Sequence, residues 1–341
     1  MSVLTTRDKS IDFIKGIAIY LVVLGHCWSI SKDLFQFIYS FHMPLFFCIS
    51  GYLFSSKKKY GDFLIAKFKT LIIPYILFFI FSFIISVSLL DREVTILQGL
   101  EYMIKGGKHC IYVCNWPLWY LPLFFLVSNI LYFISKIKIT AIRYIFLITS
   151  FLLSVPIQNY CNDTIIYNFV PFALNSLCPA LFFMLFAMEF RIIKNKVAPK
   201  IDKKIKRIAT PILSAGLFII GLLLAAGNSE QIVNIKSYTF MIYSLLMIQF
   251  IALICQGCEN KYITYIGNNS LIILGFHRIL IYVLREYFEV EKLLNHLHIS
   301  KFAEAFLVSC VCILLICGTK ELICFVVKCC KKHLYIKPKV L

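Results

Sequence analysis

The stretch IDFIKGIAIYLVVLGHCWSI, residues 11–30, decides the fold class of this chain. It is an apolar run of about 20 residues, which is the length that an α-helix needs to cross the hydrocarbon core of a bilayer. An ionisable side chain is costly at that depth, and it usually marks a functional pathway. The stretch therefore predicts a membrane span, and His26 is its first candidate functional residue.

Similar apolar runs recur along all 341 residues, of which 60% are hydrophobic and only 15% are charged. A soluble domain has about a quarter of its residues charged. The runs are continuous and lack the alternating pattern of transmembrane β-strands. We predict an all-α, polytopic transmembrane bundle that forms a single domain over residues 1–341, with no separate soluble domain. The ten spans are expected at residues 11–30, 34–55, 71–90, 117–135, 143–157, 169–190, 208–226, 238–256, 268–287 and 302–327, and the fifth is expected to end at Pro156.

The lysine and arginine residues predict how the bundle is oriented. Ten spans place both termini on one side, and most of the 35 lysines and arginines fall on that side, many of them in the basic loop 191–207. Cytoplasmic loops carry this excess, so both termini are expected in the cytoplasm. The charge of +18 is spread over many loops, and it does not indicate nucleic-acid binding. We expect a multi-pass protein of the inner (cytoplasmic) membrane, in contact with membrane lipid.

Lys15 and His26 lie eleven residues apart, about 20° from a whole number of helical turns. One helix face would then carry Lys15 near the cytoplasmic edge and His26 roughly 16 Å further out. Asp12 lies one turn before Lys15 and can pair with it. Histidine suits general-base catalysis near neutral pH. The alternatives are that Lys15 extends to the interface and that His26 makes an interhelical hydrogen bond.

The second span contains FHMPLFFCISGY, residues 41–52. His42 is expected near the outer mouth of the bundle, where a catalytic role and interfacial placement are equally consistent with its position. Pro44 frees a backbone carbonyl, which a nearby group must satisfy. Gly51 is expected to permit close packing of two helices.

Residues 11–26 and 41–52 together resemble the membrane-bound acyltransferase 3 family, and the similarity is closest to its fucose 4-O-acetylase-like branch. The family signature is a basic residue, ten residues and then a histidine, which Lys15 and His26 match in the lysine form. Residues 119–121 and 267–271 fit the family as well, so the resemblance covers nearly the whole chain.

This resemblance implies an O-acyltransferase that moves an acyl group, usually acetyl from cytoplasmic acetyl-CoA, to a hydroxyl of a cell-surface or lipid-linked glycan. His26 would be the essential catalytic residue, either as a base or as an acyl carrier. Lys15, supported by Asp12, would lie toward the acyl-CoA, with Lys67 and Lys69. Family members often carry arginines in this last region, and lysine cannot grip phosphate in a bidentate manner.

The acceptor is expected on the outer side. Trp119 and Tyr120 offer an aromatic surface for a sugar ring, and His42 is a further candidate there. His277 and the adjacent Arg278 are also candidates, although a structural role for His277 is equally consistent with the sequence.

Glu189 and Arg191 are expected to form an interfacial ion pair. No metal site is indicated, because His296 and His298 have no further ligands nearby in sequence. A transporter or flippase for a lipid-linked sugar is the main rival function, although the paired half-repeats common in carriers are not found. A scaffold or sensor with haem between His26 and His42 is the third.

Overall fold

The computed structural model describes residues 9–162, 170–197, 203–225 and 231–334. Regular structure in these ranges is helical, apart from one isolated bridge between Gln231 and Asn234. The α-helices are α1 (Lys9–Gly25), α2 (Lys32–Tyr39), α3 (His42–Tyr52), α4 (Tyr60–Lys67), α5 (Ile73–Ser88), α6 (Ile96–Lys105), α7 (Tyr120–Lys136), α8 (Thr140–Asn162), α9 (Leu177–Val197), α10 (Lys203–Ala225), α11 (Tyr238–Ile254), α12 (Lys261–Asn268), α13 (Ser270–Tyr282), α14 (Val290–His296) and α15 (Lys301–Leu334).

The prediction of a polytopic helical bundle is confirmed. In the described ranges, six helical segments are long and apolar enough to cross a membrane, or seven if the pair that bends by 79° between α12 and α13 counts as one span. Each of the ten predicted runs overlaps at least one helix. The protein is thus a multi-pass membrane protein.

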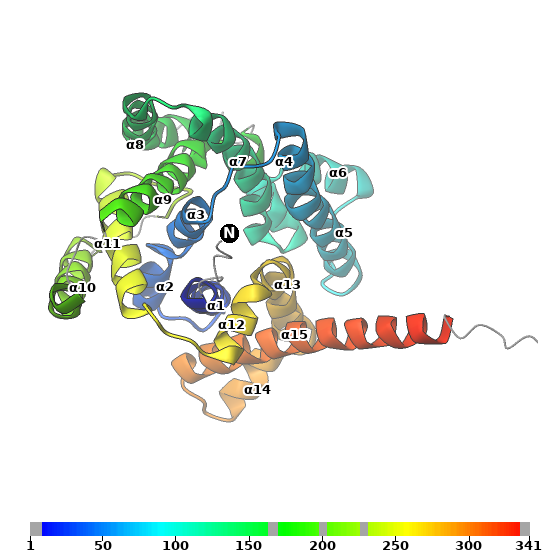
Figure 1. Cartoon of the computed structure of the whole chain (residues 1–341). Coiled ribbons are helices and arrows are strands. Elements are labelled where there is room, and N and C mark those ends of the chain that lie inside the picture. Colours follow the sequence, from blue (N-terminus) through cyan, green and yellow to red (C-terminus); the bar gives the residue numbers. More distant parts are fainter. Residues whose placement is uncertain (1–8, 163–169, 198–202, 226–230, 335–341) are drawn as a thin grey trace, which may run out of the picture.

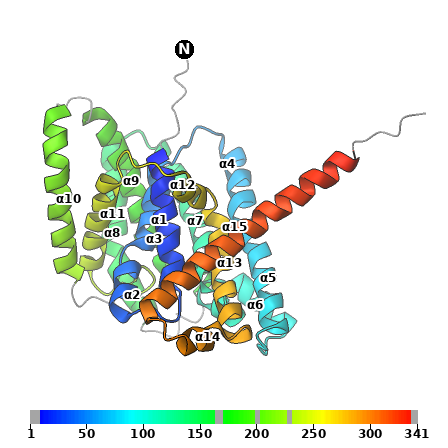
Figure 2. The ribbon, with the colours of Figure 1, turned by 90° about the horizontal axis from the view of Figure 1, so that it is seen from below.

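Helix α1 lies in the middle of the bundle, where it packs against α3, α12, α13 and α15 (Figure 1). Helices α1 and α4 begin at one end of the bundle, which we call the inner end (Figure 2). Helices α2, α6 and α14 lie at the opposite, outer end. The C-terminal part of α15 extends away from the other helices in both views.

Helix α1 is shorter than the sequence predicts. It ends at Gly25 rather than at residue 30. The next two amides donate to carbonyls three residues back, His26 N to Val23 O at 3.1 Å and Cys27 N to Leu24 O at 3.1 Å. This tighter turn closes the helix. His26 therefore lies on the turn that follows α1 and not on its face.

The second predicted span breaks between α2 and α3, so Pro44 lies in the first turn of α3. An N–H at that position has no partner within the helix, and Pro44 therefore does not free a helical carbonyl as the sequence suggested. The carbonyl of Ser40, which is the C-cap of α2, accepts from the Ser244 hydroxyl on α11 at 2.6 Å and ties α2 to α11.

The predicted end of the fifth span at Pro156 is wrong. Helix α8 continues through this proline to Asn162. The Tyr238 hydroxyl donates at 2.7 Å to the carbonyl of Leu152, which is the group that Pro156 leaves free. A tertiary donor therefore allows the helix to continue.

Glycines set the closest helix contacts. A Cβ on Gly51 would lie 2.0 Å from the carbonyl oxygen of Met184, so α3 approaches the backbone of α9 directly. A Cβ on Gly16 would lie 2.1 Å from the carbonyl oxygen of Ile263, which fixes α1 against α12 in the same way. The role expected for Gly51 is confirmed.

The expected ion pair between Glu189 and Arg191 is wrong. Glu189 is buried and pairs with Arg143 on α8, with Nε and Oε1 2.6 Å apart. Arg191 donates instead to the carbonyls of Tyr52 at 2.6 Å and Phe54 at 2.9 Å. Residues two positions apart point about 200° away from each other around a helix, so the two side chains meet different neighbours.

Candidate functional site

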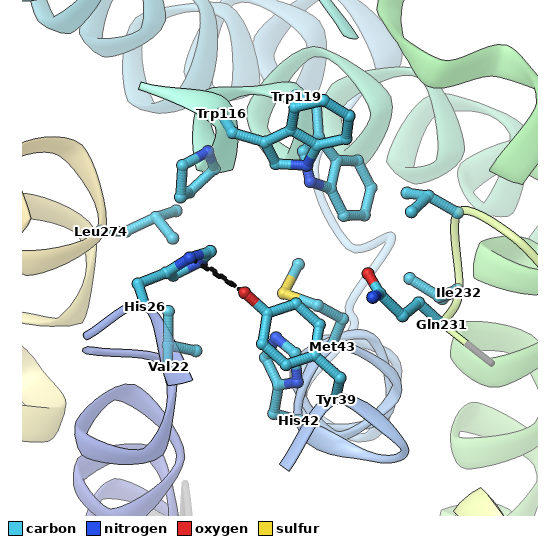
Figure 3. Close-up of a pocket in the computed structure, with 12 residues that line it drawn as sticks. Val22, His26, Tyr39, His42, Met43, Trp116, Trp119, Gln231, Ile232 and Leu274 are labelled. Carbon is cyan, nitrogen blue, oxygen red and sulfur yellow. Dashed lines mark hydrogen bonds between the residues drawn. The ribbon is translucent and has the colours of Figure 1, made fainter. Parts of the chain in front are cut away.

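His26 lies where α1, α2 and α13 meet. The hydroxyl of Tyr39 on α2 lies 2.9 Å from Nδ1 of His26 and 3.3 Å from Nε2 (Figure 3). Arg278 on α13 donates from Nη1 to the backbone carbonyl of His26 at 2.6 Å. The imidazole and its turn are therefore held by a hydroxyl on one side and a guanidinium on the other. An imidazole oriented in this way can take up a proton or act as a nucleophile.

His277 lies beside His26, with their ring centroids 5.2 Å apart. The side chain is fully buried, and Nδ1 donates to the carbonyls of Ile273 at 2.9 Å and Leu274 at 3.0 Å. These bonds place the proton on Nδ1 and leave Nε2 as an acceptor. Within the described residues Nε2 has no hydrogen-bond partner. A buried acceptor without a partner is costly, which favours a role for His277 at the site.

His42 is also brought to this site. It is buried, and Nδ1 donates to the carbonyl of Ile38 at 2.8 Å. Its ring packs edge-on against Tyr39, with centroids 4.7 Å apart. Tyr39 therefore contacts the rings of both His26 and His42.

Two cavities are lined by His26, and a third adjoins them. The central pocket holds about 20 Å³ and is lined by His26, Tyr39 and His42, with Trp116 and Trp119 across it (Figure 3). The outer pocket holds about 270 Å³ and shares His26 and Tyr39 with the central pocket.

The inner pocket also holds about 270 Å³ and shares Met43 and Leu274 with the central pocket. Lys15 lines its wall, and most of the other lining residues are apolar. The three pockets thus form a row that runs from Lys15 past His26 to the outer pocket.

The predicted donor-side residues lie at or near the inner pocket. Lys15 pairs with the buried Asp12, with Nζ 3.3 Å from Oδ1, as the sequence suggested. Nζ of Lys67 lies 4.7 Å from the ring centroid of Phe124, which lines the pocket. Lys69 is exposed and is not among the described residues that line it.

The two predicted aromatic residues line different pockets. Trp119 lines the central pocket. Tyr120 lines the inner pocket, as Lys15 does. Trp119 and Tyr120 were both expected at the outer mouth. The difference arises because η3 (Trp116–Trp119) ends here and α7 begins at Tyr120, so the two side chains leave the backbone in different directions.

One wall of the central pocket comes from the segment 231–235, which the sequence did not indicate. Gln231, Ile232 and Val233 line the pocket (Figure 3). The buried Gln158 on α8 holds the segment at two points: its Nε2 donates to Ile232 O and its Oε1 accepts from Ile235 N, each at 2.6 Å. Only the folded chain brings this loop to His26.

No metal centre is found in the described ranges. No group of three or more His, Cys, Asp or Glu side chains there lies close enough together to hold an ion. His26, His42 and His277 converge, but Nδ1 of the last two is already bonded to backbone carbonyls.

Comparison with known proteins gives one extensive match and two short ones. The acyltransferase 3 family, described as an acyltransferase domain, matches residues 8–320. The nodulation protein NolL of Sinorhizobium fredii is 49% identical over 14% of this chain and 16% of the relative. NolL of Mesorhizobium japonicum is 48% identical over the same shares. The matched segment thus spans about a sixth of these relatives. No solved structure matches.

Proposed function

The chain belongs to the acyltransferase 3 family, and from this premise we propose that it is a membrane-bound O-acyltransferase in which His26 catalyses transfer of an acetyl group. The donor is acetyl-CoA from the cytoplasm. The acceptor is a hydroxyl of a cell-surface or lipid-linked glycan, and the protein works in the inner (cytoplasmic) membrane. The geometry around His26 supports this reading over a carrier of lipid-linked sugars, because this imidazole lines two of the pockets in the row and the third adjoins them.

One observation carries the proposal: His26 lies at the junction of the pockets. It lines the central and the outer pocket, and the central pocket shares Met43 and Leu274 with the inner pocket. A thioester that enters from the inner side and a hydroxyl that enters from the outer side would therefore meet at one imidazole. General-base catalysis requires this arrangement, because the base must be within hydrogen-bond reach of the proton that it removes.

The inner pocket suits the pantetheine arm of acetyl-CoA. It is largely apolar, and its inner end carries Lys15. Lys15 and Lys67 would attract the phosphate groups of the donor, which remain near the cytoplasmic edge. The rise along α1 from Lys15 to Gly25, the residue before His26, is roughly 15 Å, which is of the same order as an extended pantetheine arm.

The reaction uses His26 as a base. The acceptor oxygen attacks the thioester carbonyl carbon, and His26 takes the proton from the acceptor hydroxyl. The C–S bond then breaks, and CoA leaves as a thiol after His26 returns the proton to sulfur. Tyr39 would hold the imidazole in place through its hydrogen bond. The Tyr39 hydroxyl can serve either ring nitrogen, because it lies within 3.3 Å of both.

The size of the central pocket supports acetyl as the acyl group. At about 20 Å³ it has room for little more than a methyl group beside His26. A longer acyl chain would have to displace Met43 or Leu274, which separate this pocket from the inner one.

The first test is transfer of label from acetyl-CoA to surface glycan in membranes from cells that produce the intact chain or its His26→Ala variant. We expect O-acetyl label with the intact chain and a loss of about 100-fold or more in the variant. The matched control is His296→Ala, because that histidine is exposed on α14 and should be dispensable. Equal labelling by His26→Ala at equal amounts of folded protein would refute the role of His26.

A second measurement separates direct transfer from an acyl relay. The purified protein is mixed with labelled acetyl-CoA and no acceptor, then quenched and digested. Direct transfer predicts no label on the peptide that contains His26. A stable fraction of label at His26 would instead establish the relay, in which His26 carries the acetyl group itself.

A further inference from the structure

The outer pocket carries a positive charge that lacks a carboxylate partner. Arg278 is half-buried at the pocket wall. Its guanidinium donates hydrogen bonds to two neutral groups, the carbonyl of His26 and, at 3.2 Å, the hydroxyl of Tyr282. Within the described residues, no carboxylate lies within 4.0 Å of Arg278. A partly buried charge is costly without an opposite charge, and in membrane proteins such groups usually serve function.

A second arginine lines the same pocket. Arg285 lies on η7 (Val283–Tyr287) and pairs with the partly exposed Glu291 through Nε and Oε2 at 2.9 Å. Within the described residues its guanidinium makes no other hydrogen bond, so its remaining N–H groups can bind a ligand. None of the described residues that line the outer pocket is acidic. The pocket therefore presents two guanidinium groups and no negative charge to a ligand.

The rest of the outer pocket is aromatic. Trp28, Phe35, Tyr39 and Tyr282 line it, and the rings of Phe35 and Tyr39 stack with centroids 4.0 Å apart. The indole N–H of Trp28 donates to the buried carboxylate of Glu304, which fixes the orientation of its ring. Flat apolar faces of this kind cover the C–H face of a sugar ring.

The volume limits what can bind. At about 270 Å³ the outer pocket falls just below the range of about 300–1,000 Å³ that is usual for small-molecule sites. It has room for one sugar ring rather than for several. A ring held there would lie next to His26, which lines the same pocket.

We propose that the outer pocket binds an anionic sugar unit, in which a carboxylate or phosphate next to the acceptor ring is held by Arg278 and Arg285. This inference rests on the proposed function and adds the charge class of the acceptor to it. The guanidinium fork suits both anions, since each offers paired oxygens for two parallel N–H bonds.

Binding of simple sugars to the full chain in detergent micelles tests this proposal in the absence of acyl donor. The probes are methyl glucuronoside for the carboxylate, glucose 1-phosphate for the phosphate, and methyl glucoside as the neutral match. Tryptophan fluorescence reports on Trp28 in the pocket wall together with Trp116 and Trp119 in the adjoining central pocket, and calorimetry gives the affinity. We expect at least one anionic probe to bind about tenfold or more tightly than methyl glucoside, with a preference that falls as salt is raised. The anionic probe that binds more tightly shows whether the anion is that of a sugar acid or a sugar phosphate.

Charge-removing variants locate the effect. Arg285→Gln and Arg278→Gln should each reduce the anionic preference, and the exposed Lys292→Gln on the same side should leave it unchanged. Arg278 also supports the turn at His26, so Arg285→Gln keeps the test valid if Arg278→Gln does not fold. Equal binding of neutral and anionic probes, or a preference that survives Arg285→Gln, would overturn the anionic pocket. If the intact chain still binds the anionic probes more tightly than methyl glucoside but transfers no acyl group, only the proposed function is refuted.

Discussion

The hydroxyl oxygen of Tyr39, the last residue of α2, lies 2.9 Å from Nδ1 of His26, which lies on the turn after α1. We expect Tyr39→Phe to lower kcat by roughly tenfold to 100-fold, because one hydrogen bond to the reacting imidazole is lost while the ring remains. The measurement is steady-state transfer from acetyl-CoA. Tyr262→Phe, at an exposed tyrosine, is the control. Unchanged kcat in Tyr39→Phe would show that this hydroxyl does not orient His26 during the reaction.

Met43 and Leu274 separate the inner pocket from the central one, so they should set the length of the acyl group. We expect Met43→Ala to raise the ratio of kcat/KM for butyryl-CoA over acetyl-CoA by about tenfold or more, since each methylene that gains room is worth about 1–3 kcal/mol.

Leu274→Ala should act in the same direction as Met43→Ala. Ile49→Ala is the comparison, because Ile49 lines the inner pocket but not the central one. If Ile49→Ala broadened the acyl preference as much as Met43→Ala, the limit would lie elsewhere in the inner pocket.

The Ser244 hydroxyl on α11 donates to the carbonyl of Ser40 at the end of α2. We expect Ser244→Ala to reduce stability by about 1–3 kcal/mol, because a buried carbonyl loses its partner. Thermal unfolding in detergent measures the change. The control is Ser88→Ala, at an exposed serine whose hydroxyl donates within its own helix. An equal loss in both variants would show that the bond to Ser40 adds no stability of its own.

The sequence predicted the local parts of this fold well. The length of an apolar run determines whether it can span a bilayer, so the helical bundle followed directly from runs such as residues 169–190, where the structure has a membrane-length helical segment over Pro171–Val197. The pairing of Asp12 with Lys15 and the close contact at Gly51 are equally local patterns.

The features that could not be predicted from the sequence depend on contacts between residues far apart in the chain. Helix α8 passes through Pro156 because the donor to Leu152 is Tyr238, 86 positions away. His26 is held by Arg278, which is 252 positions away. Gln231 reaches the central pocket on a loop whose position depends on Gln158. No local pattern encodes such pairings, so the histidines could be chosen from the sequence but their partners could not.

Lys15 lines the inner pocket with 23% of its side chain exposed, and Asp12 holds it there. We expect Lys15→Gln to raise KM for acetyl-CoA by roughly fivefold to 50-fold with a smaller effect on kcat, because a cation that binds donor phosphate contributes to binding before the chemical step. The effect should weaken as salt is raised. Lys67→Gln should act in the same direction. The exposed Lys57→Gln, also near the inner end, is the matched control for net charge. A loss of kcat with unchanged KM in Lys15→Gln would place Lys15 in the chemical step instead. If Lys57→Gln raised KM by the same amount as Lys15→Gln, general attraction of the donor to the basic inner face would be responsible.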